Sequence, residues 1–319
     1  MSDLDQLLRQ IADPSELAWN EETYDLALAR GLPDADRATY VAKLLETARE
    51  GDTHAILTLG HLHAVEALAM LQAAAKSTAP WAPTARRALV LLGHGAEVVD
   101  AIAHDAVHAP AKMARVAAVL DLPRIGGATA IAALDQALAD PDSAVRMLAW
   151  NGLVAALDLD RWIRSPEGKH EKTTHLELLK DFLASDLAAF VRMGTGEMRA
   201  ITQPLLAGAD PASLGLAWIP DPAPDVSNRI LQAIVDPDAA YPVDDIAKLT
   251  GIPRRWAEAS LAMRLDQAEP DPRVPDALVQ LSATWTVPVL EEVARSPSIS
   301  PELGAKLTHA ASELRANAN

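Results

Sequence analysis

Small and apolar residues recur at helical spacing between residues 139 and 157. The turn Asp140-Pro141-Asp142 precedes this stretch, and Asp142 or Ser143 can cap a helix that begins there. A spacing of i, i+3, i+4, i+7, i+8 and i+11 places one set of side chains on a single helical face. This face consists of Val145, Leu148, Ala149, Gly152, Leu153 and Ala156. Since an apolar face must be covered, the stretch predicts a helix that packs against a neighbouring helix.

The same pattern occurs twice upstream and indicates a repeat. Pro83 and Pro110, like Pro141, are each followed four or five residues later by an arginine and then by an apolar helical stretch. No stretch with strand-like alternation competes with this helical spacing. We therefore expect an all-α fold, an α-solenoid of stacked antiparallel helix pairs, with more than about 60% of the residues in helices.

A second repeated feature is a helix end followed by a turn. Leu59-Gly60 and Leu92-Gly93 begin two such junctions, 33 residues apart (59 to 92), a period typical of stacked helix pairs. The first junction reads LGHLHAVEAL, and this order of Leu-Gly, a turn and Ala-Val-x-x-Leu resembles a HEAT-like repeat. The resemblance covers about residues 50–157, and it implies an α-solenoid. The last unit, VLEEVARSPSISPELGAKLTHAASEL, is similar to the variant leucine-rich repeat, another helical solenoid, with SPSISPE as its turn.

The remaining pattern suggests two helical regions joined by a proline-rich connection. Three prolines in the eight residues WIPDPAPD disfavour helix at 218–225. We therefore expect an N-terminal HEAT-like region at 1–217 and a C-terminal helical repeat region at 226–319. The polar residues 158–174 predict a loop or irregular insertion. Further helices are expected at 15–30, 34–50, 175–184, 187–207, 226–235, 243–250, 254–265, 275–283 and 287–294.

Composition narrows the class of protein. Half of the residues are apolar, but Phe and Tyr total only five (two and three) and the chain has no Cys. Without cysteine there are no disulfides, thiolate zinc sites, iron–sulfur ligands or cysteine nucleophiles. Acidic residues near the N-terminus replace the positive charge of a signal peptide, and no window reaches about 18 uncharged apolar residues. We expect a soluble, cytoplasmic protein without a cofactor.

The net charge of −16 is unevenly distributed. Residues 1–52 hold 12 acidic and 5 basic residues, or −7; residues 53–128 hold 5 and 6, or +1; residues 129–200 hold 11 and 8, or −3; residues 201–319 hold 16 and 9, or −7. A negative field repels phosphate backbones and anionic lipid. We therefore expect a protein partner, basic in character, and neither nucleic acid nor a membrane. Ordinary solubility of an exposed helical surface is the alternative explanation of the charge.

Histidines are the candidate binding residues, because six of the nine lie between residues 54 and 108. Residues 100, 104 and 108 are spaced by four and share one helical face, opposite the apolar one. Residues 61 and 63 occupy the turn of the first repeat. Two histidines and a carboxylate at this spacing can bind zinc, but exposed surface residues are the commoner explanation. The predicted partner-binding residues are His61, His63, Asp100, His104 and His108, and no metal site is expected.

Two other patterns were weighed for chemistry. The segment from His170 to His175 imitates the zinc-protease motif HExxH, but its second His comes one residue too late to share a helical face with the first. Gly126-Gly127 and Gly194-Thr195-Gly196 are interpreted as helix breaks. An arginine ladder can either brace successive turns, as in HEAT-like proteins, or form a basic binding face, as in some helical-repeat DNA glycosylases; the net charge favours bracing. The ladder consists of Arg87, Arg115, Arg146 and Arg192.

The sequence therefore favours a non-enzymatic scaffold or adaptor that holds a protein partner on the concave face of an α-solenoid. Two alternatives stay open. One is an inhibitor or immunity protein that covers a basic toxin or nucleic-acid enzyme. The other is a helical-repeat enzyme, which would show a deep pocket with convergent titratable groups.

Overall fold

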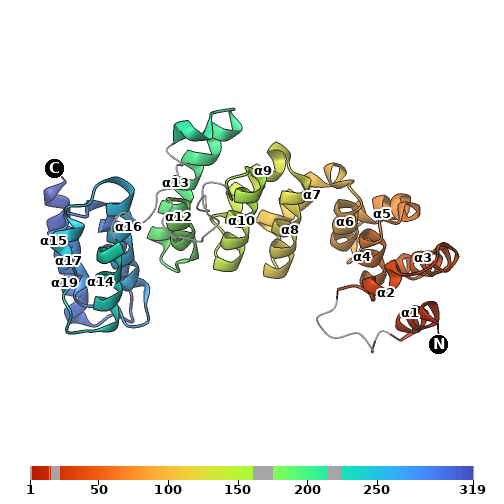
Figure 1. Ribbon diagram of the computed structural model, residues 1–319, viewed down its shortest axis with the longest axis horizontal. Coiled ribbons are helices and arrows are strands. Elements are labelled where there is room, and N and C mark those ends of the chain that lie inside the picture. Colours follow the sequence, from red (N-terminus) through yellow and green to blue (C-terminus); the bar gives the residue numbers. More distant parts are fainter. Residues whose placement is uncertain (1, 14, 16–21, 161–174, 215–223, 319) are drawn as a thin grey trace. The chain divides into compact units, whose positions relative to one another are not determined.

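A computed structural model describes residues 2–13, 15, 22–160, 175–214 and 224–318 (Figure 1). Every element in these ranges is a helix, and helix makes up 75% of the structure. The prediction of an all-α protein is therefore confirmed. The chain divides into two compact units, unit 1 (Met1–Ala137) and unit 2 (Leu138–Asn319). The predicted proline-rich connection at 218–225 lies outside the described residues as far as 223, and the predicted loop at 158–174 lies outside them from 161.

Unit 1 is built from alternating helices. Its elements are α1 (Asp3–Ala12), α2 (Leu26–Arg30), α3 (Asp34–Arg49), α4 (Thr53–His61), η2 (Val65–Ala67), α5 (Leu68–Ala75), α6 (Ala82–Leu91), η3 (Gly95–Glu97), α7 (Val99–His108), α8 (Lys112–Ile125) and α9 (Gly127–Ala137). Helices α4, α6 and α8 pack against one another in succession. Helix α3 packs on α4, α5 on α6, and both α7 and α9 on α8. Each helix thus covers the apolar face of a neighbour.

Helices α4 and α6 end in the same way, but the equivalent residues are 30 apart and not 33 as predicted. Gly60 lies inside α4, whereas Gly93 follows the end of α6, so the predicted pairing of Leu59-Gly60 with Leu92-Gly93 is wrong. His63 after α4 and Gly93 after α6 adopt left-handed φ values of 51° and 86°. The next amide then reaches back to the helix: Ala64 N donates to Leu59 O at 3.1 Å, and His94 N donates to Leu89 O at 2.8 Å. This closure satisfies helix carbonyls that would otherwise lack partners. A short 3₁₀ turn follows in both cases, and α5 begins after it at Leu68.

Close packing in unit 1 depends on a small residue in the first junction. A Cβ atom added at Gly60 in α4 would lie 2.9 Å from Ala88 Cα in α6. Such a distance is shorter than a van der Waals contact. The Leu-Gly pair of the junction therefore lets the two helix backbones approach.

Unit 2 contains helices of 4 to 19 residues, the longest of them α13 and α19. Its elements are α10 (Ser143–Ala156), α12 (His175–Ala184), α13 (Ala188–Leu206), η4 (Pro211–Leu214), α14 (Pro224–Val235), α15 (Val243–Ile246), α16 (Gly251–Ala262), η5 (Met263–Asp266), α17 (Val274–Gln280), η6 (Thr284–Thr286), α18 (Val287–Ala294) and α19 (Pro301–Asn317). Helix α12 packs against α10, α13 and α16, while α18 packs against α13 and α19.

Helix α10 confirms the predicted start and corrects the predicted face. Asp142 is the N-cap, and its carboxylate accepts a hydrogen bond from Ala144 N at 2.9 Å. Most residues of the predicted apolar face are buried, but Leu148 is only half-buried. Arg146 and Trp150, which the prediction did not assign to this face, are buried. The arginine can be buried because main-chain oxygens accept its hydrogen bonds.

Several predicted elements differ from the observed ones. Helix α1 was not expected, and the predicted helix at 15–30 is helical only from Leu26 in its described part. It begins there because Asp25 caps it, while Tyr24 N donates to Thr58 Oγ1 at 3.0 Å and fixes the preceding chain. Gly194 and Gly196 do not break a helix, since both lie inside α13. Gly126 does separate α8 from α9, with φ 69°.

Among the described residues, no helix combines the length and the apolar character that a bilayer span requires.

Candidate functional site

The structure does not bring the five predicted binding residues into one site. His61 ends α4, His63 lies in the turn after it, and Asp100, His104 and His108 lie on the exposed face of α7. The rings of His104 and His108 are 4.9 Å apart and tilted against each other. Within the described ranges, no three His, Asp or Glu side chains are placed to hold a metal ion.

His61 lies in a basic surrounding and not in an acidic one. Burial lowers the pKa of its imidazole, and the nearby guanidinium groups of Arg87, Arg30 and Arg124 lower the pKa further. Its main-chain oxygen accepts a hydrogen bond from Arg30 Nη2 at 3.4 Å. His61 is therefore a neutral side chain at pH 7, and it does not attract an anionic ligand by its own charge.

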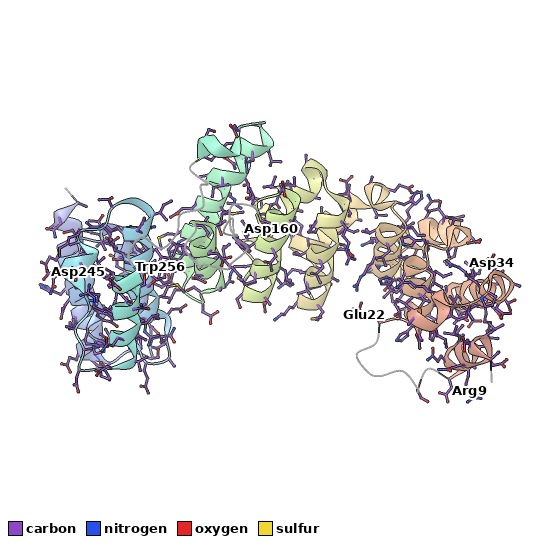
Figure 2. All side chains as sticks on the ribbon, in the orientation of Figure 1. Arg9, Glu22, Asp34, Asp160, Asp245 and Trp256 are labelled. Carbon is purple, nitrogen blue, oxygen red and sulfur yellow. The ribbon has the colours of Figure 1, made fainter. Side chains whose placement is uncertain are left out.

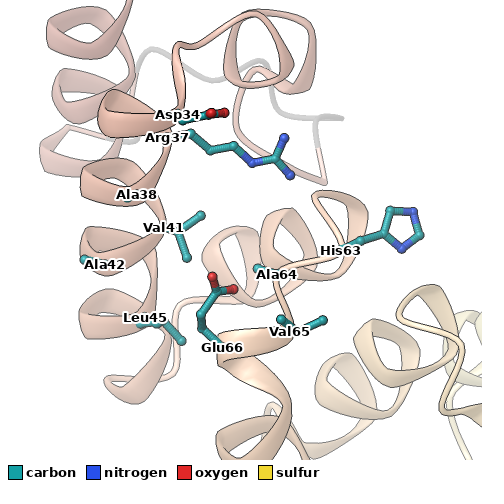
Figure 3. A pocket seen from close by; sticks show the side chains of 10 residues that line it. All are labelled: Asp34, Arg37, Ala38, Val41, Ala42, Leu45, His63, Ala64, Val65 and Glu66. Atoms are coloured by element: carbon teal, nitrogen blue, oxygen red, sulfur yellow. The ribbon is translucent and has the colours of Figure 1, made fainter.

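His63 lies beside an open groove of about 400 Å³ between α3 and the turn that leads into η2 (Figure 3). We call it the α3–η2 groove. It is separate from the predicted face of α7, because no α7 residue lines it. The lining residues are Asp34, Arg37, Ala38, Val41, Ala42, Leu45, His63, Ala64, Val65 and Glu66.

The floor of the α3–η2 groove is apolar. Ala38, Val41, Ala42 and Leu45 follow one another at i, i+3, i+4 and i+7, which places them on one face of α3. Val65 stands opposite them, and it is 71% exposed although it is a large apolar residue. Val41 is buried and Leu45 is half-buried, so the exposed apolar surface of the groove consists of Val65 and the small side chains of Ala38 and Ala42. Exposed apolar side chains bordered by polar residues are typical of a surface that binds another molecule.

The rim of the groove is acidic. Asp34 lies at the start of α3 (Figure 2), and the Glu66 side chain points from η2 towards α3 (Figure 3). Arg37 keeps its positive charge and offsets one of the two carboxylates, while its Nη2 donates to Leu62 O at 2.8 Å and braces the turn. Apolar side chains flanked by cations match this combination of floor and rim.

Of the ten side chains that line the groove, Asp34, Arg37, His63 and Glu66 are ionisable, and none is Ser, Thr, Cys or Lys. The sequence contained one signal of the groove, the apolar spacing on α3. The groove was not predicted because apolar spacing on a helix predicts a buried face, and the sequence does not show which part of that face stays uncovered.

The predicted arginine ladder braces turns at two of its four positions. Arg115 Nη1 donates to the oxygens of Ala109 and Pro110, at 3.0 and 3.3 Å. Arg146 Nη1 repeats this geometry with Asp140 and Pro141, at 2.8 and 3.0 Å. The interval between proline and arginine therefore lets the side chain fold back onto the carbonyls of the turn.

The other two ladder positions behave differently. Arg87 pairs with Glu22, 3.0 Å from Nη2 to Oε2, and lies 3.8 Å from Asp121. Arg192 is 67% exposed in its side chain and lies 3.7 Å from Glu292. The glutamate is itself engaged, because it accepts hydrogen bonds from Ala188 N and Ala189 N and so caps α13.

No family model matches the chain, and neither does any curated protein or solved structure. The functional interpretation therefore rests on the residues of the molecule itself.

Proposed function

We propose that this protein is a non-enzymatic scaffold or adaptor that binds a basic protein partner, and that the α3–η2 groove receives an amphipathic basic segment of that partner. The observation that carries the proposal is an apolar groove with an exposed valine, Val65, bordered by the carboxylates of Asp34 and Glu66. A helical segment with apolar residues on one face and Lys or Arg beside them would fill the groove and complement its rim.

The helix packing of unit 1 supports a scaffold. We infer that α4, α6 and α8 with their partners form HEAT-like repeats of an α-solenoid, since successive helices contact only near neighbours and two junctions share one geometry. Proteins of this architecture commonly bind partners along an extended surface.

Charge supports a basic partner. Residues 1–52, which include α3, carry −7. Such a field accelerates encounter with a positively charged protein and opposes binding to phosphate backbones. Long-range attraction would bring the partner close, and the apolar floor would then hold it.

The proposal can be tested by capture of partners from the native host with the full chain as bait. Val65→Glu places a charge on the floor and should abolish capture, while the fold should tolerate it because Val65 is exposed. Val235→Glu is the matched control, since Val235 is 83% exposed in unit 2 and lines no part of the groove. Equal capture by the two variants would contradict the assignment of the groove.

Charge reversal tests the acidic rim separately. Asp34→Lys with Glu66→Lys should weaken binding of the recovered partner, whereas Glu302→Lys, an exposed acidic residue of α19, should not. If the partner has an enzymatic activity, measuring it with and without the protein separates an adaptor from an inhibitor. Turnover of a substrate by the purified chain would support the enzyme alternative.

A further inference from the structure

Three arginines of unit 1 gather around His61, the last residue of α4. Arg30 is the last residue of α2, Arg87 lies in α6, and Arg124 lies in the last turn of α8. All three guanidinium groups lie near enough to lower the pKa of the His61 imidazole. We call Arg30, Arg87 and Arg124 the arginine cluster, and none of the three lines the α3–η2 groove.

Helix packing, and not a sequence motif, produces the arginine cluster. Arg87 Nε and Arg124 Nη1 each lie 3.8 Å from Oδ1 of the buried Asp121 in α8. Arg30 Nη2 donates to the main-chain oxygen of His61 at 3.4 Å. The helices α2, α4, α6 and α8 therefore bring these cations together on one surface, in a chain whose net charge is −16.

A carboxylate of the same chain already lies on the arginine cluster. Glu22 Oε2 is 3.0 Å from Arg87 Nη2, and the Glu22 side chain is 61% exposed. Two residues later Tyr24 is buried and its N donates to Thr58 Oγ1, so the chain is anchored close to this contact. An exposed ion pair of this kind contributes little to stability, because water and salt compete with it. Another carboxylate can therefore replace Glu22 at small cost.

All three arginines offer a group that a ligand can reach. Arg30 is exposed, the Arg124 side chain is 56% exposed, and Arg87 presents Nη2 where the exposed Glu22 contacts it. Asp121 stays ionised at pH 7.5, although burial raises its pKa to about 6. The cluster with Asp121 and Glu22 thus holds three positive and two negative charges, or +1. Displacement of Glu22 raises this local charge to +2, which favours an anionic ligand.

The chemistry of the cluster favours a carboxylate over a phosphate backbone. Guanidinium groups bind carboxylates through paired N–H···O bonds, and Glu22 shows that a carboxylate fits beside Arg87. Nucleic acid is bound along an extended stripe or patch of cations, which three arginines opposed by two carboxylates do not form.

We propose that the arginine cluster binds a carboxylate side chain of an acidic protein segment, and that Glu22 holds this place in the free protein. At 0.1 M salt the Debye length is about 10 Å, so the acidic residues farther away are largely screened and do not prevent the contact. This inference is independent of the function proposed for the α3–η2 groove.

The test is saturation-transfer NMR with the full chain at pH 7.5 and 0.1 M salt. The probe is tetraglutamate with acetylated and amidated ends, and tetraglutamine blocked in the same way is the matched control without charge. We expect transfer to tetraglutamate, with a dissociation constant on the order of 1 mM for so few exposed ion pairs, and none to tetraglutamine. Tetrathymidylate tests the phosphate backbone. No transfer to tetraglutamate, equal transfer to tetraglutamine, or tighter binding of tetrathymidylate would overturn the proposal.

Removal of the Glu22 charge should free the cluster. Glu22→Gln should tighten tetraglutamate binding about 3-fold, as loss of a weak exposed competitor predicts. Glu46→Gln is the matched control and should leave the affinity unchanged, since Glu46 forms a similarly exposed pair with Lys43 at 2.9 Å elsewhere in unit 1. Unchanged affinity in Glu22→Gln, or an equal gain in Glu46→Gln, would show that Glu22 does not compete for the site and would overturn the proposal.

The two more exposed arginines provide the opposite test. Arg30→Gln combined with Arg124→Gln should weaken tetraglutamate binding about 10-fold, while Arg87 stays in place and preserves the packing of α6. Arg9→Gln combined with Arg49→Gln removes the same charge from exposed positions of unit 1 outside the cluster. This control should change the affinity by less than about 2-fold, because its charges are distant and screened. Equal weakening by the two double variants would overturn the assignment of binding to the cluster.

Discussion

Nε of Arg146, in α10, donates to the main-chain oxygen of Leu183, in α12, at 2.6 Å. The same guanidinium donates through Nη2 to Ser185 O at 2.6 Å, just beyond the end of α12. Its Nη1 reaches the turn before α10. One buried side chain thus ties the start of α10 to the end of α12, and it satisfies carbonyls that helix ends leave without partners.

We expect Arg146→Met to lower the free energy of unfolding by about 3–5 kcal/mol, because it leaves several buried carbonyl groups without donors. Arg115→Met is the matched control, since Arg115 contacts its turn in the same way but is only half-buried. That variant should cost about 1 kcal/mol. Urea denaturation of both variants measures the difference, and an equal loss would mean that burial of Arg146 contributes nothing beyond its local turn.

Two glycines of α13 should respond in opposite ways to alanine. A Cβ at Gly194 would lie 3.0 Å from Phe182 Cβ and 3.2 Å from Leu183 Cγ, so Gly194→Ala should destabilise the protein by about 1–3 kcal/mol. A Cβ at Gly196 would meet nothing within 4 Å, so Gly196→Ala should stabilise the helix by about 0.5–1 kcal/mol. Thermal melts of the two variants compare them directly. An unchanged melting temperature for Gly194→Ala would contradict the close packing of α12 on α13.

Several helices of this protein were predictable from apolar spacing. Helix α18 was predicted at 287–294 and α12 at 175–184, which are the observed bounds. The spacing cannot show which apolar face is left uncovered, and therefore the α3–η2 groove was not predicted. Burial of Arg146 was also hidden, because its acceptors Leu183 and Ser185 lie far away in the sequence. Apolar spacing predicts the helices, whereas contacts between residues far apart in the sequence determine which side chains are exposed.

Of the five residues predicted to bind a partner, only His63 lines the α3–η2 groove. His63 does lie beside a groove, yet the histidines of α7 line no part of it. Helical spacing correctly placed His104 and His108 on one exposed face. Whether that face meets the residues near α4 depends on packing, which no local pattern contains.

Asp121 should make stability depend on pH between about 4 and 7. Burial raises the pKa of its carboxyl from 3.8 to about 6 in the folded protein. The folded state therefore holds the proton more tightly than the unfolded state. Its stabilising contribution is complete below pH 3.8 and is lost as the pH rises through 6. Relative to Asp121→Asn, the wild type should gain on the order of 2 kcal/mol in unfolding free energy from pH 7 to pH 4. Urea denaturation across this range measures the gain.

Asp271→Asn is the control of opposite sign. Burial alone would raise the pKa of Asp271, but hydrogen bonds from Arg273 and Tyr241 lower it to about 2. The wild type should therefore lose stability relative to Asp271→Asn as the pH falls from about 4 to 2. A flat difference between wild type and Asp121→Asn from pH 7 to pH 4 would show that the carboxyl of Asp121 is not desolvated in the folded protein.

The acidic rim of the α3–η2 groove should make partner association depend on salt. Exposed charges interact over a Debye length of about 10 Å at 0.1 M salt, so raising the salt from about 50 to 500 mM should slow association markedly and change dissociation less. Replacing Asp34 and Glu66 with Asn and Gln removes two of these charges while keeping side-chain shape, and it should flatten the salt dependence. His63→Ala should weaken binding at all salt concentrations, because His63 lies beside the groove, whereas His104→Ala on α7 should leave it unchanged. Stopped-flow association of the recovered partner with each variant provides the measurement. A salt dependence that is equally steep in the Asn/Gln variant would place the contact surface elsewhere on unit 1 or on unit 2.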